Sequence, residues 1–269
     1  MVFACGGGAD TTTTATTSET TMAETTMAAT TTNAPAESTT TAVAGLEGEI
    51  LVSAAASLTE AFGEMETEFE AANPGVDVVL NLGSSSSLRE QIIEGAPADV
   101  FASANTSNMD QVVEAGEAEG GEIFVSNLLQ IAVPAGNPAG IVGLEDFANE
   151  DLLIGLCAED VPCGDFGRQA LENAGVTPAI DTNEPDVRAL LTKVEAGELD
   201  AGITYVTDVL STDGAVEGVD IPDEFNVVAE YPIAALSNAP NPDAASAFVE
   251  YVLSDEGQAI LASYGFLSP

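Results

Sequence analysis

Short apolar runs alternate with segments of helical periodicity along most of this chain. The first run, residues 50–55, precedes Leu58, Phe62, Met65 and Phe69 at helical spacing, and an Asn-Pro-Gly turn at 73–75 ends that helix. Two further apolar runs, 76–82 and 98–104, are each followed by another helical segment. Because parallel strands need crossover connections, the alternation predicts an α/β fold built on a parallel sheet with crossover helices.

Two long extended runs, 123–134 and 226–236, bracket a middle α/β segment with expected strands at 151–156 and 201–206. Helices are expected at 164–173, 185–198 and 242–264. This layout predicts two lobes joined by two crossing strands, each lobe a mixed, mostly parallel sheet flanked by helices. We place lobe 1 at 47–128 plus 234–269 and lobe 2 at 129–233. Such folds bind their ligand in the cleft between the lobes.

The N-terminal region differs in composition from the rest. Residues 6–46 are rich in Thr, Ala, Ser and Glu without apolar periodicity, which predicts a disordered stalk. Residues 1–5, Met-Val-Phe-Ala-Cys, look like the end of a bacterial lipoprotein signal, with Cys5 as the lipidated residue. The charged and apolar parts of a signal are missing. Either the start of the chain was assigned too late, or the match arose by chance.

The chain carries 45 acidic and 4 basic residues and no histidine, for a formal net charge of −41. Such a surface repels nucleic acid and anionic lipid, so we expect no nucleic-acid partner and membrane attachment only through a lipid anchor. Similar surfaces suit high salt, which screens charge. Without histidine a catalytic triad is impossible, and no Walker, GxSxG or GxGxxG pattern occurs. We expect neither an enzyme, nor a cofactor, nor direct metal ligands.

Four predicted strand-to-helix turns could hold an anion. Free N–H groups at a helix N-terminus attract anions, and serine hydroxyls add donors. The turns contain Ser57, with Glu60 as a capping-box partner, then the run 84–87 of four serines, then Cys163 and Val187. Each turn alone is typical of an ordinary N-cap. Several turns at the carboxyl ends of strands, and more serines than one cap requires, favour an anion site.

Two further features leave alternatives open. Three of the four cations, Arg89, Arg168 and Arg188, fall near these turns and either tune the local field or pair with carboxylates; we assign none as a ligand. Cys157 and Cys163 are close enough in sequence to form a disulfide outside the cytosol, or they are free thiols.

The motifs together resemble a known family. AAASL, SSSSL, GAPADVFASA, VPCG, PDVRALL, GITYVTD and the closing GQAILASYGF are similar, in order and spacing, to the periplasmic molybdate-binding proteins of bacterial ABC importers, from about residue 49 to 266. The resemblance implies a type II periplasmic-binding-protein fold and a tetrahedral oxyanion held by neutral donors. Aligned by motif, these donors are the hydroxyls of Ser57, Ser85 and Tyr205 and the backbone N–H groups of Cys163 and Val187. Without the resemblance, Tyr205 would be read as a packed core residue.

The resemblance carries further expectations. It implies high-affinity binding of molybdate or tungstate by a monomer, with a membrane permease and its cytoplasmic ATPase as partners. The protein would be extracytoplasmic, either lipid-anchored or periplasmic. A disulfide from Cys157 to Cys163 would pin the loop that presents the Cys163 N–H. Sulfate or another tetrahedral oxyanion is the alternative ligand; a ferric-iron site lacks clustered tyrosines, and an adhesive surface protein does not explain the motif order.

Overall fold

The computed structural model describes residues 45–269, so the lipobox, Cys5 and all but the last residues of the expected stalk lie outside the described part. The strands are β1 (Gly48–Ala55), β2 (Val76–Gly83), β3 (Val100–Ala102), β4 (Glu122–Pro134), β5 (Ile154–Cys157), β6 (Thr182–Glu184), β7 (Ala201–Tyr205), β8 (Val216–Asp220) and β9 (Val228–Ala235). The α-helices are α1 (Thr59–Ala72), α2 (Ser85–Ile93), α3 (Thr106–Glu114), α4 (Pro162–Asn173), α5 (Val187–Glu195), α6 (Val206–Leu210), α7 (Pro242–Leu253) and α8 (Asp255–Ser263). Two 3-10 helices, η1 (Ala56–Leu58) and η2 (Leu144–Ala148), complete the elements.

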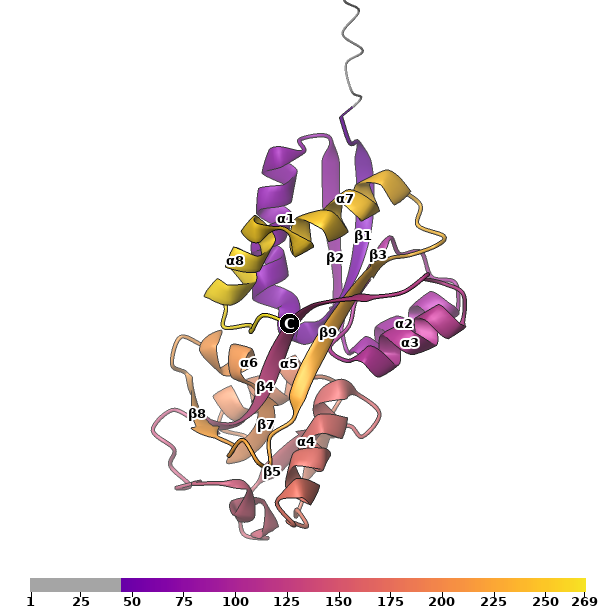
Figure 1. The fold of residues 1–269 in the computed structure, drawn as a ribbon. Coiled ribbons are helices and arrows are strands. Elements are labelled where there is room, and N and C mark those ends of the chain that lie inside the picture. Colours follow the sequence, from indigo (N-terminus) through magenta and orange to yellow (C-terminus); the bar gives the residue numbers. More distant parts are fainter. Residues whose placement is uncertain (1–44) are drawn as a thin grey trace, which may run out of the picture. The chain divides into compact units, whose positions relative to one another are not determined.

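The strands pair in the order β2-β1-β3-β9-β4-β7-β5-β6, with β8 beside β4. Pairs among β1, β2 and β3 and among β5, β6 and β7 are parallel, whereas β4, β8 and β9 make antiparallel pairs. Strand β4 changes partner along its length: up to Leu128 it pairs with β9, and from Leu129 with β7. Figure 1 shows β4 and β9 running together between the two groups of helices. The change of partner falls where we place the first lobe boundary; the boundaries themselves stay a prediction.

Three strands of the parallel groups are buried along their whole length. β3, β5 and β7 contain only buried residues, which explains why they read as continuous apolar runs and not as alternating patterns. Helix α1 packs Phe62 and Phe69 against Phe248 of α7, with ring centroids 6.0 and 5.3 Å apart. Sheet and helices thus hold the ends of the strands in a fixed arrangement.

Sequence periodicity missed several short elements and one break. The expected helix at 242–264 is two helices, because Ser254 leaves helical geometry and its hydroxyl accepts the Gly257 N–H as the N-cap of α8. β6 and β8 were not predicted, because their residues, Thr-Asn-Glu and Val-Glu-Gly-Val-Asp, are mostly polar or glycine and mostly not buried. The five residues of α6 are too few to show a helical period.

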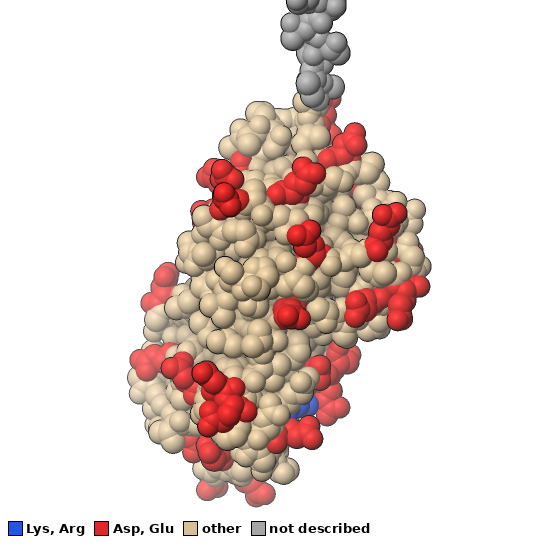
Figure 2. Space-filling view, viewed as in Figure 1, with Lys and Arg blue, Asp and Glu red and all other residues tan. Residues whose placement is uncertain are grey.

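Acidic side chains cover the surface. Figure 2 shows carboxylates spread over the viewed face from one end of the body to the other, with little basic surface between them. All four cations sit in ion pairs: Arg89 with Glu90, Arg168 with Glu159, Arg188 with Glu60 and Lys193 with Glu184. The arginines near the predicted anion turns were expected either to tune the local field or to pair with carboxylates. The structure shows them paired with carboxylates. Within residues 45–269, no helix is both long enough and apolar enough to cross a membrane.

Candidate anion-binding site

The carboxyl ends of the parallel strands converge on one small cavity. Its lining comes from the turns after β1, β2, β3, β5, β6 and β7: Ala55, Ala56, Ser57, Gly83, Ser84, Ser85, Ala104, Pro162, Cys163, Asp186, Val187 and Tyr205. All five predicted ligand residues are among them. The cavity volume is about 20 Å³, slightly more than the ~10–15 Å³ that one water molecule requires. The site therefore suits a small, compact ligand.

Two serine hydroxyls are held in place by neighbours. The Ser85 Oγ accepts the Ala104 N–H at 2.9 Å, so its own hydrogen remains available to another acceptor. The Ser57 Oγ lies 2.8 Å from the Tyr231 hydroxyl. Both serines are buried, at 1% and 5% exposed. The predicted capping box between Ser57 and Glu60 is wrong, because α1 has Leu58 as its N-cap residue and the Glu60 carboxylate bonds Arg188 instead.

Two helix N-termini open onto the same cavity. Val187 is the first residue of α5 and Cys163 the second of α4. The first four N–H groups of a helix have no partner within it, and the helix dipole adds positive potential there. Asp186, the N-cap of α5, accepts the Ala189 N–H at 2.9 Å and is the one carboxylate in the lining. Among the described residues that line the cavity there is no lysine or arginine.

Tyr205 supplies a hydroxyl that the protein itself does not satisfy. The side chain is 1% exposed, and its oxygen has no hydrogen-bond partner among the described residues. Its ring packs edge-on against Tyr231, with centroids 6.0 Å apart. Burial raises the pKa of Tyr205 well above its usual value, and the neighbouring Tyr231 and the Asp208 carboxylate add to the rise, so the hydroxyl keeps its proton. A buried hydroxyl without a partner is costly, which indicates a donor kept for a ligand.

Sequence reasoning missed three contributors. Tyr231 lies 174 residues from the Ser57 hydroxyl that it contacts, and Ala104 contributes only a backbone N–H. Neither role has a local sequence signal. The apolar run 226–236 could nevertheless have marked Tyr231 as a core residue. Asp186 could have been found, because an aspartate directly before a helical period is a typical N-cap.

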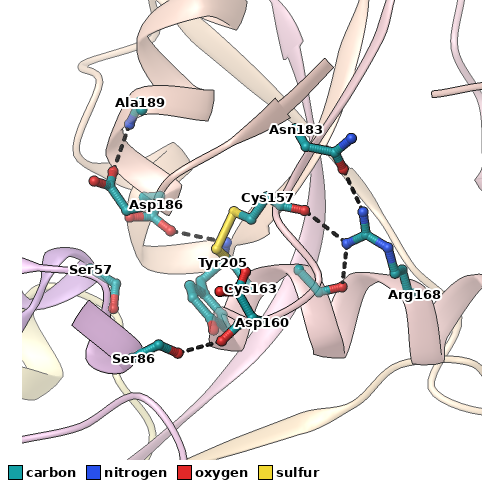
Figure 3. Close-up of a disulfide and its surroundings, with 12 residues drawn as sticks. Ser57, Ser86, Cys157, Asp160, Cys163, Arg168, Asn183, Asp186, Ala189 and Tyr205 are labelled. Atoms are coloured by element: carbon teal, nitrogen blue, oxygen red, sulfur yellow. Dashed lines mark hydrogen bonds between the residues drawn. A yellow bond between two sulfur atoms is a disulfide. The ribbon is translucent and has the colours of Figure 1, made fainter. Parts of the chain in front are cut away.

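The loop between β5 and α4 is closed by a disulfide. The sulfurs of Cys157 and Cys163 are bonded at 2.10 Å, and Figure 3 shows this bridge together with the contacts around it. Arg168 donates to the carbonyls of Cys157 and Gly164, at 2.8 and 2.9 Å. Gly164 is required here, because a Cβ would lie 1.7 Å from the Ala158 carbonyl oxygen. The loop that leads to the Cys163 N–H is therefore pinned at both ends.

We expect loss of this bridge in a Cys157→Ser/Cys163→Ser variant to lower the free energy of unfolding by about 2 kcal/mol, since it closes a short loop. Urea denaturation of the full chain measures the change. The same loss should appear when the wild-type protein is unfolded under reducing conditions. Equal stability of variant and wild type would contradict the prediction.

Fold and cavity together are those expected of a protein that binds a small ligand at the carboxyl ends of its strands. The sequence matches the bacterial extracellular solute-binding protein family over residues 50–267, and the chain belongs to this family. The expected resemblance and the expectation of a non-catalytic protein are thereby confirmed at the level of the family. An extracellular family also fits the expected extracytoplasmic location.

Individual relatives agree with this assignment. The chain is 39% identical to the molybdate-binding protein ModA of Mycobacterium tuberculosis strain H37Rv, over 88% of this chain and 91% of the relative. Among solved structures it is similar to the substrate-binding domain of a putative molybdenum ABC transporter from Clostridium difficile, with a TM-score of 0.62, 27% identity and coverage of 82% and 99%. It also resembles the sulfate-binding protein SubI of M. tuberculosis, with a TM-score of 0.74, 19% identity and coverage of 82% and 86%. At that identity the last likeness shows the fold alone.

Proposed function

We propose that this protein binds molybdate, and tungstate without strong discrimination, in the cavity described above. The observation that carries the proposal is the donor set: two buried serine hydroxyls, two helix N-termini and the unpaired Tyr205 hydroxyl converge on one small volume without a cation. A fully deprotonated dianion accepts from every one of these donors, and the helix dipoles supply part of the field. The ModA relatives support molybdate as the ligand.

The role follows from the ligand. We propose that the chain delivers the oxyanion, as a monomer and without a cofactor, to the membrane permease and cytoplasmic ATPase of an ABC importer. Lipid attachment at Cys5 would keep it at the outer face of the membrane. Cys5 lies outside the described residues, so this attachment rests on the N-terminal sequence alone.

Thermal unfolding of the full chain in high salt, with each oxyanion in turn, tests the ligand. At a hundred times its dissociation constant a ligand adds about 2.7 kcal/mol, or roughly 5–10 °C for a body of this size. We expect molybdate and tungstate to raise the Tm, and sulfate and phosphate to leave it unchanged. Phosphate is included because at neutral pH it often carries a proton, for which the hydroxyl and N–H donors offer no acceptor; Asp186 is the one carboxylate in the lining. A shift with sulfate alone would keep the site but overturn the assigned ligand, and no shift at all would overturn the binding function.

A further inference from the structure

An ion pair joins the two sides of the cavity at a point that no ligand residue occupies. Glu60 lies on α1, which packs against β2 and against helices α7 and α8. Arg188 lies on α5, which packs against β4, β5 and β7 and, on the Glu60 side of the cavity, against η1. The Arg188 guanidinium donates to both Glu60 carboxylate oxygens, at 2.6 and 3.3 Å, across 128 residues of sequence. The two side chains are only 33% and 31% exposed, so solvent screens this pair less than a fully exposed one.

Arg188 is also connected to two of the proposed oxyanion donors. It directly follows Val187, whose N–H begins α5. Its guanidinium donates to the Ser211 hydroxyl at 2.9 Å, and that hydroxyl donates to the Asp208 carbonyl at 2.7 Å. The Asp208 carboxylate in turn accepts the Tyr205 N–H at 3.0 Å. A movement of Arg188 relative to Glu60 would therefore also displace the Val187 N–H and the Tyr205 hydroxyl.

A second contact crosses the cavity elsewhere. The Ser86 hydroxyl, in the four-serine run, donates to the carbonyl of Asp160 in the disulfide-closed loop, as the dashed line in Figure 3 shows. Two contacts from α1 and α2 thus reach across to α5 and to the loop before α4. Only the first of them involves charges, and it takes one of just four cations in the chain.

We propose that Glu60 and Arg188 are positioning residues that hold the cavity closed around its ligand. This proposal rests on the proposed function. It assigns part of the affinity for the oxyanion to an ion pair that does not contact the oxyanion. Their ion pair keeps the N-terminus of α5 facing the serines after β1 and β2. Since the pair spans the cavity, it holds the two sides together with or without ligand and must break before they separate, so it slows ligand release.

The chain offers a matched control on the same helix. Lys193 of α5 pairs with Glu184 at 2.6 Å, with side chains 37% and 7% exposed, and Glu184 belongs to β6 on the same side of the cavity. Lys193→Gln removes the same charge and an ion pair from α5, but no contact across the cavity.

The test compares wild type, Glu60→Gln, Arg188→Gln, their double variant and Lys193→Gln as full chains. Molybdate affinity is measured by calorimetry, and release by the rate at which bound radioactive molybdate is lost. We expect each cross-cavity variant to bind about three- to tenfold more weakly and to release faster, and the double variant to resemble the singles. Lys193→Gln should match the wild type. Small-angle scattering without ligand should give larger radii of gyration for Glu60→Gln and Arg188→Gln than for the wild type.

The two single variants change the charge in opposite directions, which separates the proposal from a field effect. If Glu60 and Arg188 acted only through the field, Glu60→Gln would strengthen dianion binding and Arg188→Gln would weaken it. Opposite changes in affinity overturn the proposal, and so do radii equal to that of the wild type. If the wild type binds no oxyanion, the proposed function fails by itself, and the radii still decide whether the pair holds the two sides together.

Discussion

Tyr205→Phe should weaken molybdate binding by about 10- to 150-fold, the equivalent of a lost hydrogen bond to a charged acceptor worth about 1.5–3 kcal/mol. The same substitution should leave the ligand-free protein as stable as the wild type or more stable. The Tyr205 hydroxyl is buried and has no hydrogen-bond partner among the described residues, so removing it sacrifices no bond within the protein. Calorimetric titration measures the affinity, and urea denaturation without ligand measures the free energy of unfolding.

Two other tyrosines make controls for this variant. Tyr251→Phe changes a partly buried tyrosine of α7 that does not line the cavity and should leave affinity unchanged. Tyr231→Phe removes the partner of the Ser57 hydroxyl at 2.8 Å and should reduce both stability and affinity. Unchanged affinity in Tyr205→Phe would show that this tyrosine is only a packed core residue.

Asp208→Asn should stabilise the protein increasingly as pH rises, by up to about 4 kcal/mol above pH 8. Burial raises the pKa of Asp208 from 3.8 to about 7; the Tyr205 N–H and the Arg188 charge oppose the rise, whereas Glu60 and Asp186 add to it. Because the folded-state pKa lies above the unfolded one, this group contributes no penalty below pH 4. Between pH 4 and pH 7 the wild type progressively loses stability, as the unfolded chain releases a proton that the folded chain retains.

Asparagine keeps the oxygen that accepts the Tyr205 N–H at 3.0 Å and removes the charge, so the packing of α6 should survive. The measurement is urea denaturation of wild type and variant from pH 5 to pH 9. Asp243→Asn, at an exposed position in the first turn of α7, removes the same charge from the acidic surface and controls for general repulsion. A difference between Asp208→Asn and wild type that is constant with pH would contradict the prediction.

The sequence alone was sufficient for the longer helices, for most of the strands and for the turns that carry the site. Helical spacing in 58–69 and apolar runs at 50–55 and 201–206 are local properties, and they correspond to α1, β1 and β7. The five proposed ligand residues follow strand ends that parallel pairing brings to one edge. Their assignment came from the resemblance, because any one of these turns could be an ordinary cap.

The tertiary structure alone decided what each serine of the 84–87 run does. Ser84 caps α2 and bonds Ser87, Ser85 accepts the Ala104 N–H, and Ser86 reaches Asp160. Four identical side chains in sequence cannot be told apart by propensity, since their partners lie up to 74 residues away.

The same holds for Glu60, which looked like a local capping partner and instead pairs with Arg188. Periodicity and caps depend on residues within one or two turns, so sequence determined the elements and the donors of the site. Which distant groups approach within bonding distance depends on how the finished elements pack, and only the folded chain determines that.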